Sequence, residues 1–289
     1  MAFGFKLGDF ELYWLNGGKF ELDGGAMFGV VPKVLWSKKF PCDEENYIPM
    51  VAFPILVKTE KEIAIIETGL GNKLTEKQKQ IYRVKDEWDL PYELQKLGVS
   101  REDVDYVILT HYDFDHAGGV VMQMHNGSLS LTFPNAKHLL QKKEWHDVTN
   151  PNKRSINTFW PINYEVLQNS KQLELVEGDV EVFKGISLSL TAGHNGGHQV
   201  VYLESKGEKA LHMGDLLPTH AHYNPLWVMA YDNYPLDSIA KKEELESWAR
   251  RENAWLTFYH DPFVLAAKFD EKGNMLNKFS TDAEGLMVL

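Results

Sequence analysis

Residues 110–119 read Thr110-His111-Tyr112-Asp113-Phe114-Asp115-His116-Ala117-Gly118-Gly119, and this stretch decides the fold. It offers four metal-ligating side chains directly after the apolar stretch Val104–Leu109, which predicts a short buried strand. Alternate residues of an extended loop point to the same side, so His111, Asp113 and Asp115 can converge, and His116 joins them if the chain turns there. The two glycines permit a tight turn and a close approach of backbones.

Two carboxylates and two imidazoles beside a buried strand are costly without a cation, because desolvation and like-charge repulsion both oppose them. Imidazole nitrogen and carboxylate oxygen are donors that zinc and other divalent metals take, and functional sites leave a position open for water. A solvated polar loop is the alternative interpretation of this segment alone. That alternative predicts no matching donors elsewhere in the chain.

Three further segments place one such donor at the end of a predicted apolar strand. The donors and their strands are His194 after Ile186–Leu190, Asp215 after Ala210–Met213, and His260 after Trp255–Phe258. Loops at strand ends carry functional side chains on a rigid frame. One histidine after a strand is usually structural, but four strand ends that each carry a donor predict a common metal site.

Together, the motifs THYDFDHAGG, TAGHNGGHQ, GDLLP and YHDP resemble the metallo-β-lactamase superfamily. The likeness is strongest to its lactonase and organophosphate-hydrolase branch and runs from about Gly8 to Pro262, including the segment IAIIETGLG. The combined motifs are highly specific, whereas each alone is moderately so. The resemblance implies an α+β fold, an αββα sandwich of two mixed sheets packed face to face with helices outside. The site is then expected at the edge where the two sheets meet.

The resemblance also implies a set of ligands for two divalent metal ions, zinc first, with iron or manganese as alternatives. The first ion would be bound by His111, Asp113 and His194. The second would be bound by Asp115, His116 and His260, with Asp215 bridging both. His198 is expected to orient a ligand or its loop, or simply to stabilise the turn.

This chain departs from the family pattern at three places. Asp113 stands where the family usually has His, and a harder, anionic ligand there shifts the preference towards iron or manganese. Glu67 stands where the family usually has Asp, and its longer arm can reach the site from outside the ligand shell. Many lactonases of this kind place a Tyr soon after the bridging Asp, whereas this chain has Leu216-Leu217-Pro218.

The expected activity is that of a dinuclear metallohydrolase. Two cations lower the pKa of a water molecule, which then opens a lactone or cleaves a carboxylic or phosphate ester of a small molecule. Asp115 is the candidate that orients this nucleophile and passes its proton to the leaving group, and Asp215 is the bridging catalytic residue. The alternatives are a diiron-type oxidoreductase or dioxygenase of the same fold, and a metal-binding protein without turnover.

The composition and charge of the chain limit the partners and the cellular compartment that we expect. The formal net charge of −11 disfavours nucleic acid, whose binding requires Lys and Arg against phosphate. The single cysteine, Cys42, excludes an internal disulfide, and no run approaches the roughly 18 apolar residues of a membrane span. The start lacks the pattern of a signal peptide. We therefore expect a cytoplasmic protein of one domain over residues 1–289 with a small-molecule substrate and no membrane partner; a homodimer is one option for its oligomeric state.

Strand and helix signals alternate along the remaining chain. A turn at Asn16-Gly17-Gly18 predicts a hairpin between its flanking strands. The expected strands are Phe10–Leu15, Lys19–Leu22, Ile48–Lys58, Glu62–Glu67, Lys137–Leu140, Leu173–Val176 and Gln199–Leu203. The expected helices are Leu74–Val84, Leu90–Leu97 and Leu236–Arg251.

Two groups of residues are candidates for substrate contact. An apolar wall can be formed by Met27, Phe28, Trp227, Met229 and Tyr231, although such residues are as often core. A polar group soon after Asp215 can contact the substrate or donate a proton, although a polar surface loop explains each member somewhat better. This group is His220, His222 and Tyr223.

Overall fold

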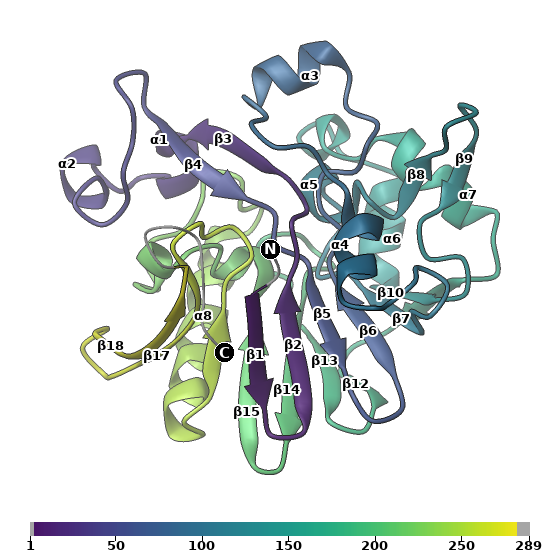
Figure 1. Ribbon diagram of the computed structural model, residues 1–289. Helices are drawn as coiled ribbons and strands as arrows, with labels where there is room; N and C mark the ends of the chain where they lie inside the picture. Colours follow the sequence, from purple (N-terminus) through teal and green to yellow (C-terminus); the bar gives the residue numbers. More distant parts are fainter. Residues whose placement is uncertain (1–2, 282–289) are drawn as a thin grey trace.

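The computed structural model describes residues 3–281, and most of its strands belong to two seven-stranded sheets (Figure 1). The first sheet pairs its early strands antiparallel and its later ones, from β6 onward, parallel. In spatial order it consists of β1 (Phe3–Leu7), β2 (Phe10–Trp14), β5 (Ile55–Lys58), β6 (Ile63–Ile66), β7 (Tyr106–Ile108), β10 (Lys137–Gln141) and β11 (Leu173–Val176).

In the second sheet the strands lie side by side in the order of the sequence. Neighbouring strands are antiparallel, except that β15 and β16 are parallel. That parallel pair requires a crossover connection, which contains the longest helix, α8 (Pro235–Arg251). The strands are β12 (Val180–Phe183), β13 (Ile186–Leu190), β14 (Gln199–Ser205), β15 (Glu208–His212), β16 (Trp255–Thr257), β17 (Val264–Phe269) and β18 (Met275–Ser280).

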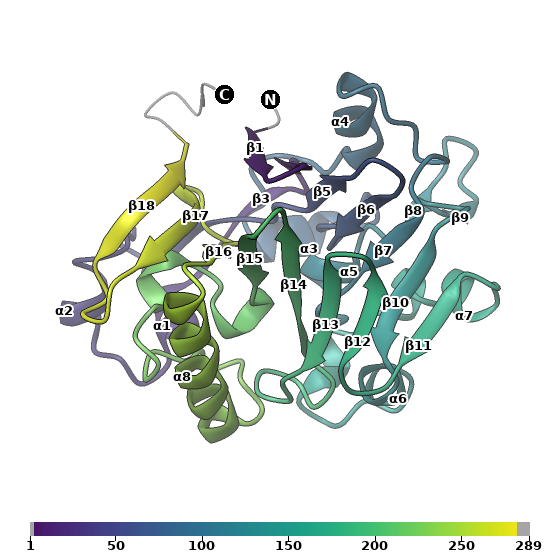
Figure 2. The same ribbon diagram turned by 90° about the horizontal axis from the view of Figure 1, so that it is seen from below.

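The two sheets lie face to face, with helices outside both (Figure 2). Side chains of both sheets meet in one apolar cluster that includes Leu12 and Val57 of the first and Leu188 and Val201 of the second. Helix α4 (Leu90–Lys96) covers the outer face of the first sheet, and α8 covers that of the second through Leu245. The α+β fold, an αββα sandwich, is therefore confirmed.

Shorter elements complete the described chain. They are α1 (Gly24–Phe28), α2 (Lys33–Trp36), α3 (Glu76–Ile81), α5 (Phe114–Ala117), α6 (Lys142–Thr149), α7 (Glu165–Gln168), β3 (Lys19–Asp23), β4 (Tyr47–Val51), β8 (Val121–Gln123), β9 (Leu129–Leu131) and the 3-10 turns η1 (Ser155–Asn157), η2 (Pro161–Asn163), η3 (Gly214–Leu216) and η4 (His220–His222). Within residues 3–281, no helix is long and apolar enough to cross a bilayer.

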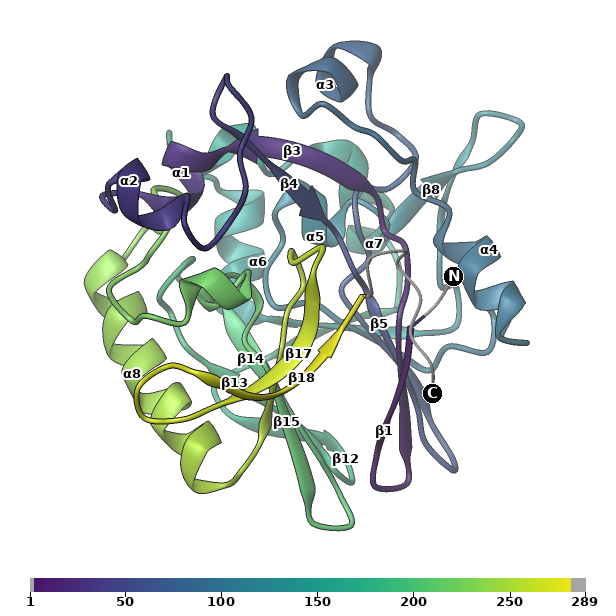
Figure 3. The same ribbon diagram turned by 60° about the vertical axis from the view of Figure 1, so that its left-hand side comes forward.

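The predicted hairpin at Asn16-Gly17-Gly18 is wrong. Strand β2 pairs with β1 and β5, whereas β3 leaves the sheet and pairs with β4 as a two-stranded ribbon. Figure 3 shows this ribbon extending across one end of the sandwich, beside α1 and α2. The physical reason is that the Gly17 backbone forms hydrogen bonds with two other segments: its N–H donates to the Ala52 carbonyl, and its carbonyl accepts from the Leu70 N–H.

Two other predicted elements differ from the observed ones. The stretch Ile48–Lys58 is two strands, because the chain leaves the ribbon at Ala52 and enters the first sheet after Pro54, and proline cannot donate to a ladder. The expected helix Leu74–Val84 shrinks to α3, which Thr75 starts with a capping box. Helix α8 agrees with the predicted Leu236–Arg251 to within one residue.

Acid should weaken the fold through His138, a fully buried residue of β10. Burial lowers its pKa from 6.5 to about 4. A lowered histidine pKa contributes stability above pH 6.5 that is lost as the pH falls through the range 6.5 to 4, because the unfolded chain takes up the proton first. We expect the free energy of unfolding to decrease by roughly 3 kcal/mol more in the wild type than in His138→Leu over this range. Urea titrations at pH 7.5 and 4.5 measure it, and parallel pH slopes would contradict it.

Candidate metal centre

The candidate ligands lie at one end of the sandwich, on loops that follow strands of both sheets. His111 follows β7 in the first sheet. The second sheet supplies His194 from the β13–β14 loop, Asp215 from η3 after β15, and His260 after β16. Since loops that follow strands build sites on a rigid frame, the donors are held in place by two sheets at once.

The chain turns inside the segment 111–116 rather than staying extended. Asp113 has extended backbone and precedes α5, whose first turn is closed by a hydrogen bond from the His116 N–H to the Asp113 carbonyl, 3.0 Å. Asp115 and His116 therefore project from a short helix, which corrects the expectation of an extended loop through Asp115. Gly118 ends this turn, where a Cβ would lie 2.2 Å from the Leu70 carbonyl oxygen.

The structure gathers six of the predicted residues into two triads. In each triad one donor atom per residue lies within 4.8 Å of the others. The first is His111, Asp113 and His194, and the second is Asp115, His116 and His260. Each triad combines two imidazoles with one carboxylate, and this is the grouping that the resemblance implied.

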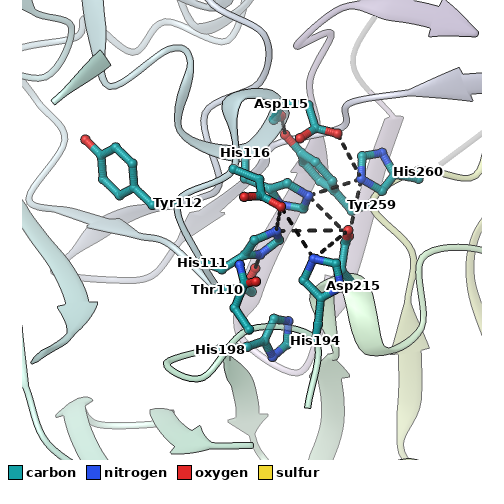
Figure 4. A network of polar contacts seen from close by, with 12 residues as sticks. Thr110, His111, Tyr112, Asp115, His116, His194, His198, Asp215, Tyr259 and His260 are labelled. Carbon is teal, nitrogen blue, oxygen red and sulfur yellow. Dashed lines mark hydrogen bonds and ion pairs between the residues drawn. The ribbon is translucent and has the colours of Figure 1, made fainter. Parts of the chain in front are cut away.

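Asp215 lies between the two triads and faces both (Figure 4). Its Oδ2 is 3.6 Å from His194 Nε2 and 4.0 Å from His111 Nε2. Its Oδ1 is 3.2 Å from His116 Nε2 and 3.3 Å from His260 Nε2. Each oxygen of one carboxylate is thus directed at a different histidine pair, which is the arrangement a bridging ligand requires.

Three of the four imidazoles are hydrogen-bonded at their outer nitrogen, Nδ1, and Nδ1 of His116 faces a carboxylate without a hydrogen bond to any described residue. His111 Nδ1 lies 2.9 Å from Thr110 Oγ1, and His260 Nδ1 lies 2.8 Å from the Val51 carbonyl. The other two face carboxylates: His194 at 2.8 Å from Asp232 and His116 at 3.4 Å from Glu67. Such contacts fix the tautomer and orientation of a ligating histidine and leave Nε2 free to bind a metal.

The inner atoms fit a pair of cations. In the described part of the chain, the buried Nε2 atoms of His111 and His194 and Oδ1 of Asp215 have no hydrogen-bond partner. Burial alone would raise the pKa of Asp113, but the adjacent His111 and His194 imidazoles lower it. Burial opposes protonation of His116, but Asp215 and Glu67 raise its pKa. A proton on His116 thus balances the neighbouring carboxylates here, and metal binding would release it.

The site opens to solvent on its carboxylate side. The side chains of Asp113, Asp115 and Asp215 are 17%, 11% and 10% exposed, whereas the imidazoles of His111 and His194 are almost fully buried. A substrate or water molecule that enters would meet the carboxylates first.

Sequence reasoning missed several residues that hold the ligand loops. Asp232 gave no signal, because it lies in a loop seventeen residues beyond Asp215, outside any motif. Glu144 accepts from the Tyr112 N–H at 3.0 Å and the Asn195 side chain at 3.3 Å, so it links two ligand loops. Tyr259 donates from its hydroxyl to the Asp115 carbonyl at 2.7 Å.

Glu67 is a departure from the family pattern whose position the structure now shows. It is fully buried, adopts a left-handed backbone with φ +63°, and accepts from the Thr110 N–H at 3.0 Å. The same oxygen faces His116. The longer side chain therefore reaches the ligand loop, as the sequence allowed.

The polar residues that follow Asp215, and His198 before it, contact neighbouring protein groups. His222 is buried, stacks on Phe28 at 4.4 Å, and its Nε2 lies 2.9 Å from the Met27 carbonyl. Tyr223 stacks on Phe269 and accepts from Arg250. His220 Nδ1 contacts Asp261, and His198 Nδ1 lies 2.7 Å from Thr191 within its own loop. Met27 and Phe28 of the candidate apolar wall are buried in a core cluster that also contains Met229 and Phe114.

Replacing Asp232 with Asn should weaken metal binding by about 10- to 100-fold, because the carboxylate that orients His194 is lost while its shape is kept. Elemental analysis after dialysis against a graded chelator series measures this, independently of any activity. Asp237→Asn, an exposed carboxylate on α8, is the matched control. Equal metal retention in both variants would show that Asp232 does not position the ligand.

Replacing Lys242 with Met should lower the free energy of unfolding by about 2 kcal/mol, because buried carbonyls would lose their donor. Lys242 is fully buried, and its ammonium donates to the carbonyls of His222 at 2.7 Å and Trp227 at 2.8 Å. Chemical denaturation measures the change, and Lys241→Met on the same helix is the control. A loss no larger than that of the control would mean that the ammonium does not stabilise this loop.

The comparisons with known proteins agree with this geometry. A family model described as the metallo-beta-lactamase superfamily matches residues 48–256, a range that holds every candidate ligand except His260. The chain belongs to this superfamily. It is accordingly an enzyme of a metallohydrolase superfamily, with the fold that the motifs predicted.

One protein with a solved structure is similar to this chain over almost its whole length. A probable metal-dependent hydrolase from Staphylococcus aureus is 41% identical, covers 96% of this chain and 99% of its own, and superposes with a TM-score of 0.91. The zinc lactonase AidC, solved with N-hexanoyl-L-homoserine as product, is 21% identical with a TM-score of 0.79, and this likeness shows the fold alone.

Sequence relatives of this chain include N-acyl homoserine lactonases. That of Bacillus thuringiensis is 30% identical over 155 residues, which is 53% of this chain and 54% of the relative. The chain thus spans about half the length of the curated relatives it matches.

Proposed function

We propose that this protein is a dinuclear metallohydrolase that opens lactones or cleaves carboxylic or phosphate esters of small molecules. The observation that carries the proposal is Asp215, whose two oxygens face two separate His-His-Asp triads. Two divalent ions, with zinc as the first candidate, would be held by the triads and shared by Asp215. Bound there, they would lower the pKa of a water molecule and polarise the electrophilic oxygen of the substrate.

The chain's own residues supply orientation and proton transfer. Asp115 directs Oδ2 towards His260 Nε2 at 3.6 Å, which leaves Oδ1 free for the attacking water and the leaving group. Oδ1 can take up the proton of the attacking water and deliver it to a leaving oxygen. The Tyr259 hydroxyl anchors the Asp115 backbone, and this contact keeps the carboxylate in place.

An aromatic stack beside the ligands favours a substrate with an apolar portion. Phe114 lies between two candidate ligands in the sequence. Its ring stacks on those of Tyr82 and Trp160, with centroid distances of 4.4 Å and 4.7 Å. Tyr82 and Trp160 are only partly buried. The acidic net charge of −11 further favours a neutral small molecule over nucleic acid. The lactonase relatives support a lactone as the first substrate to test.

A panel assay on the metal-loaded protein tests the proposal. N-acyl homoserine lactones, aryl esters and phosphotriesters would be supplied with zinc, manganese or cobalt, and metal content would be measured on the same sample. We expect hydrolysis of at least one class, its loss after chelation, and its recovery when metal is returned. Two bound ions without hydrolysis of any of the three classes would refute the hydrolase assignment.

One observation favours a second candidate, a diiron-type oxidoreductase or dioxygenase. Two imidazoles with one carboxylate is also the ligand set of non-haem iron enzymes. Protein purified without added metal separates the two functions. Two irons with visible absorption and oxygen consumption would support redox chemistry, whereas colourless protein with hydrolytic turnover supports the metallohydrolase.

A further inference from the structure

We infer that Asp113 makes the two metal positions chemically equivalent, so that neither is filled ahead of the other. The inference rests on the two metal ions of the proposed function, and it concerns which metals the site binds and in what order. With Asp113, each position receives two imidazole nitrogens and one carboxylate oxygen of its own, in addition to one oxygen of Asp215.

The contacts of Asp113 place it in the first triad alone. Its Oδ2 lies 3.5 Å from His111 Nε2 and 3.5 Å from His194 Nε2. The carboxylate of the second triad approaches one histidine, since Asp115 Oδ2 lies 3.6 Å from His260 Nε2, and its donor atom lies within 4.8 Å of that of His116. Each triad thus has one carboxylate of its own.

The equivalence extends to the groups behind the imidazoles. In each triad one histidine is backed by a buried carboxylate, namely His194 by Asp232 and His116 by Glu67. The other histidine of each triad is backed by a neutral oxygen. These neutral contacts are His111 with Thr110 and His260 with the Val51 carbonyl. Glu67 lies near a histidine of each triad, because it groups with His111 as well as with His116. The donor charge is therefore the same for both positions.

Equal donor sets have two consequences for metal binding. The first ion has no electrostatic or donor-type reason to prefer either position, so one equivalent should distribute over both. A carboxylate in place of a third imidazole also favours harder ions, so Asp113 raises the affinity for manganese or iron(II) relative to zinc. Both consequences should disappear when Asp113 becomes His.

Cadmium-113 NMR of the full chain tests the first consequence, because the chemical shift of cadmium reports its donor atoms. With the wild type stripped of metal, we expect one equivalent of cadmium to give two resonances of similar shift and comparable intensity. In Asp113→His we expect the first equivalent to give one dominant resonance at a clearly different shift. A single dominant resonance in the wild type, or an unchanged spectrum in the variant, would overturn the inference.

Competition between manganese and zinc tests the second consequence. We expect the ratio of manganese to zinc affinity to fall by about tenfold in Asp113→His. Asp113 makes no side-chain hydrogen bond that caps α5, so its substitution leaves the helix start intact; Asp113→Asn, of the same shape, checks the role of charge. Asp9→His, on an exposed turn, controls for an added imidazole. An unchanged ratio in Asp113→His would contradict the assignment.

These measurements separate the inference from the proposed function. Equivalent positions in a protein that hydrolyses none of the three substrate classes would leave the inference standing and remove the function. Hydrolysis by a protein that fills one metal position first would support the proposed function and contradict the inference.

Discussion

Asp215→Asn should reduce turnover about a thousandfold and leave the protein with less than its full metal content. Asp215 is the residue, within the described chain, that approaches all four ligand imidazoles, and each of its oxygens serves a different triad. Asparagine keeps the shape but has one oxygen and no charge. The two metal ions would lose the carboxylate that they share. A thousandfold decrease in turnover corresponds to a loss of about 4 kcal/mol of transition-state stabilisation.

Steady-state kinetics and elemental analysis of one preparation measure both effects. His116→Ala should behave similarly, because it removes an imidazole that lies 3.2 Å from Asp215. Asp9→Asn changes an exposed carboxylate by the same chemistry and should leave activity and metal content unchanged. Full activity of Asp215→Asn with unchanged metal content would exclude a bridging role for this residue.

Gly118→Ala should destabilise the protein by at least about 3 kcal/mol, the range of severe core overpacking. A Cβ at this position would lie 2.2 Å from the Leu70 carbonyl oxygen and 2.4 Å from that of Phe114. Both neighbours are backbone atoms, Leu70 in a loop and Phe114 in α5, so neither can rotate away. The loops must separate, and α5 would move with its ligands.

Thermal and urea denaturation of the metal-free protein measure this effect without interference from bound ions. Gly127→Ala is the comparison, because it introduces strain at φ +84° but has open space around it. Its cost should stay at about 1–2 kcal/mol, the value for a left-handed backbone. If Gly118→Ala were no worse than Gly127→Ala, the close backbone approach would not limit this loop.

Local motifs made the candidate site predictable, because each predicted ligand follows a strand that the sequence itself reveals. The strands before His111, His194, Asp215 and His260 are short apolar runs, and their ends converge in the structure. The seven residues came from resemblance to a family, and the coordinates bring them together. The convergence itself depends on strand order, which periodicity does not encode.

The features that the sequence did not predict depend on contacts between distant segments of the chain. The turn at Asn16-Gly17-Gly18 has the composition of a hairpin, yet the backbone of Gly17 bonds to two other segments and the strands part. Asp232 and Glu144 look like ordinary loop and helix carboxylates until the fold buries them against His194 and Tyr112. Such roles follow from burial and partner identity, neither of which a single sequence displays.

The division of the ligands between two sheets affects how the protein is made. The segment from His111 to His116 is synthesised well before Asp215 and His260. A nascent chain that ends between His116 and His194 has only the first four donors. The complete pair of sites can therefore be assembled only after His260 has been synthesised, and both ions are expected to be bound only from that point on.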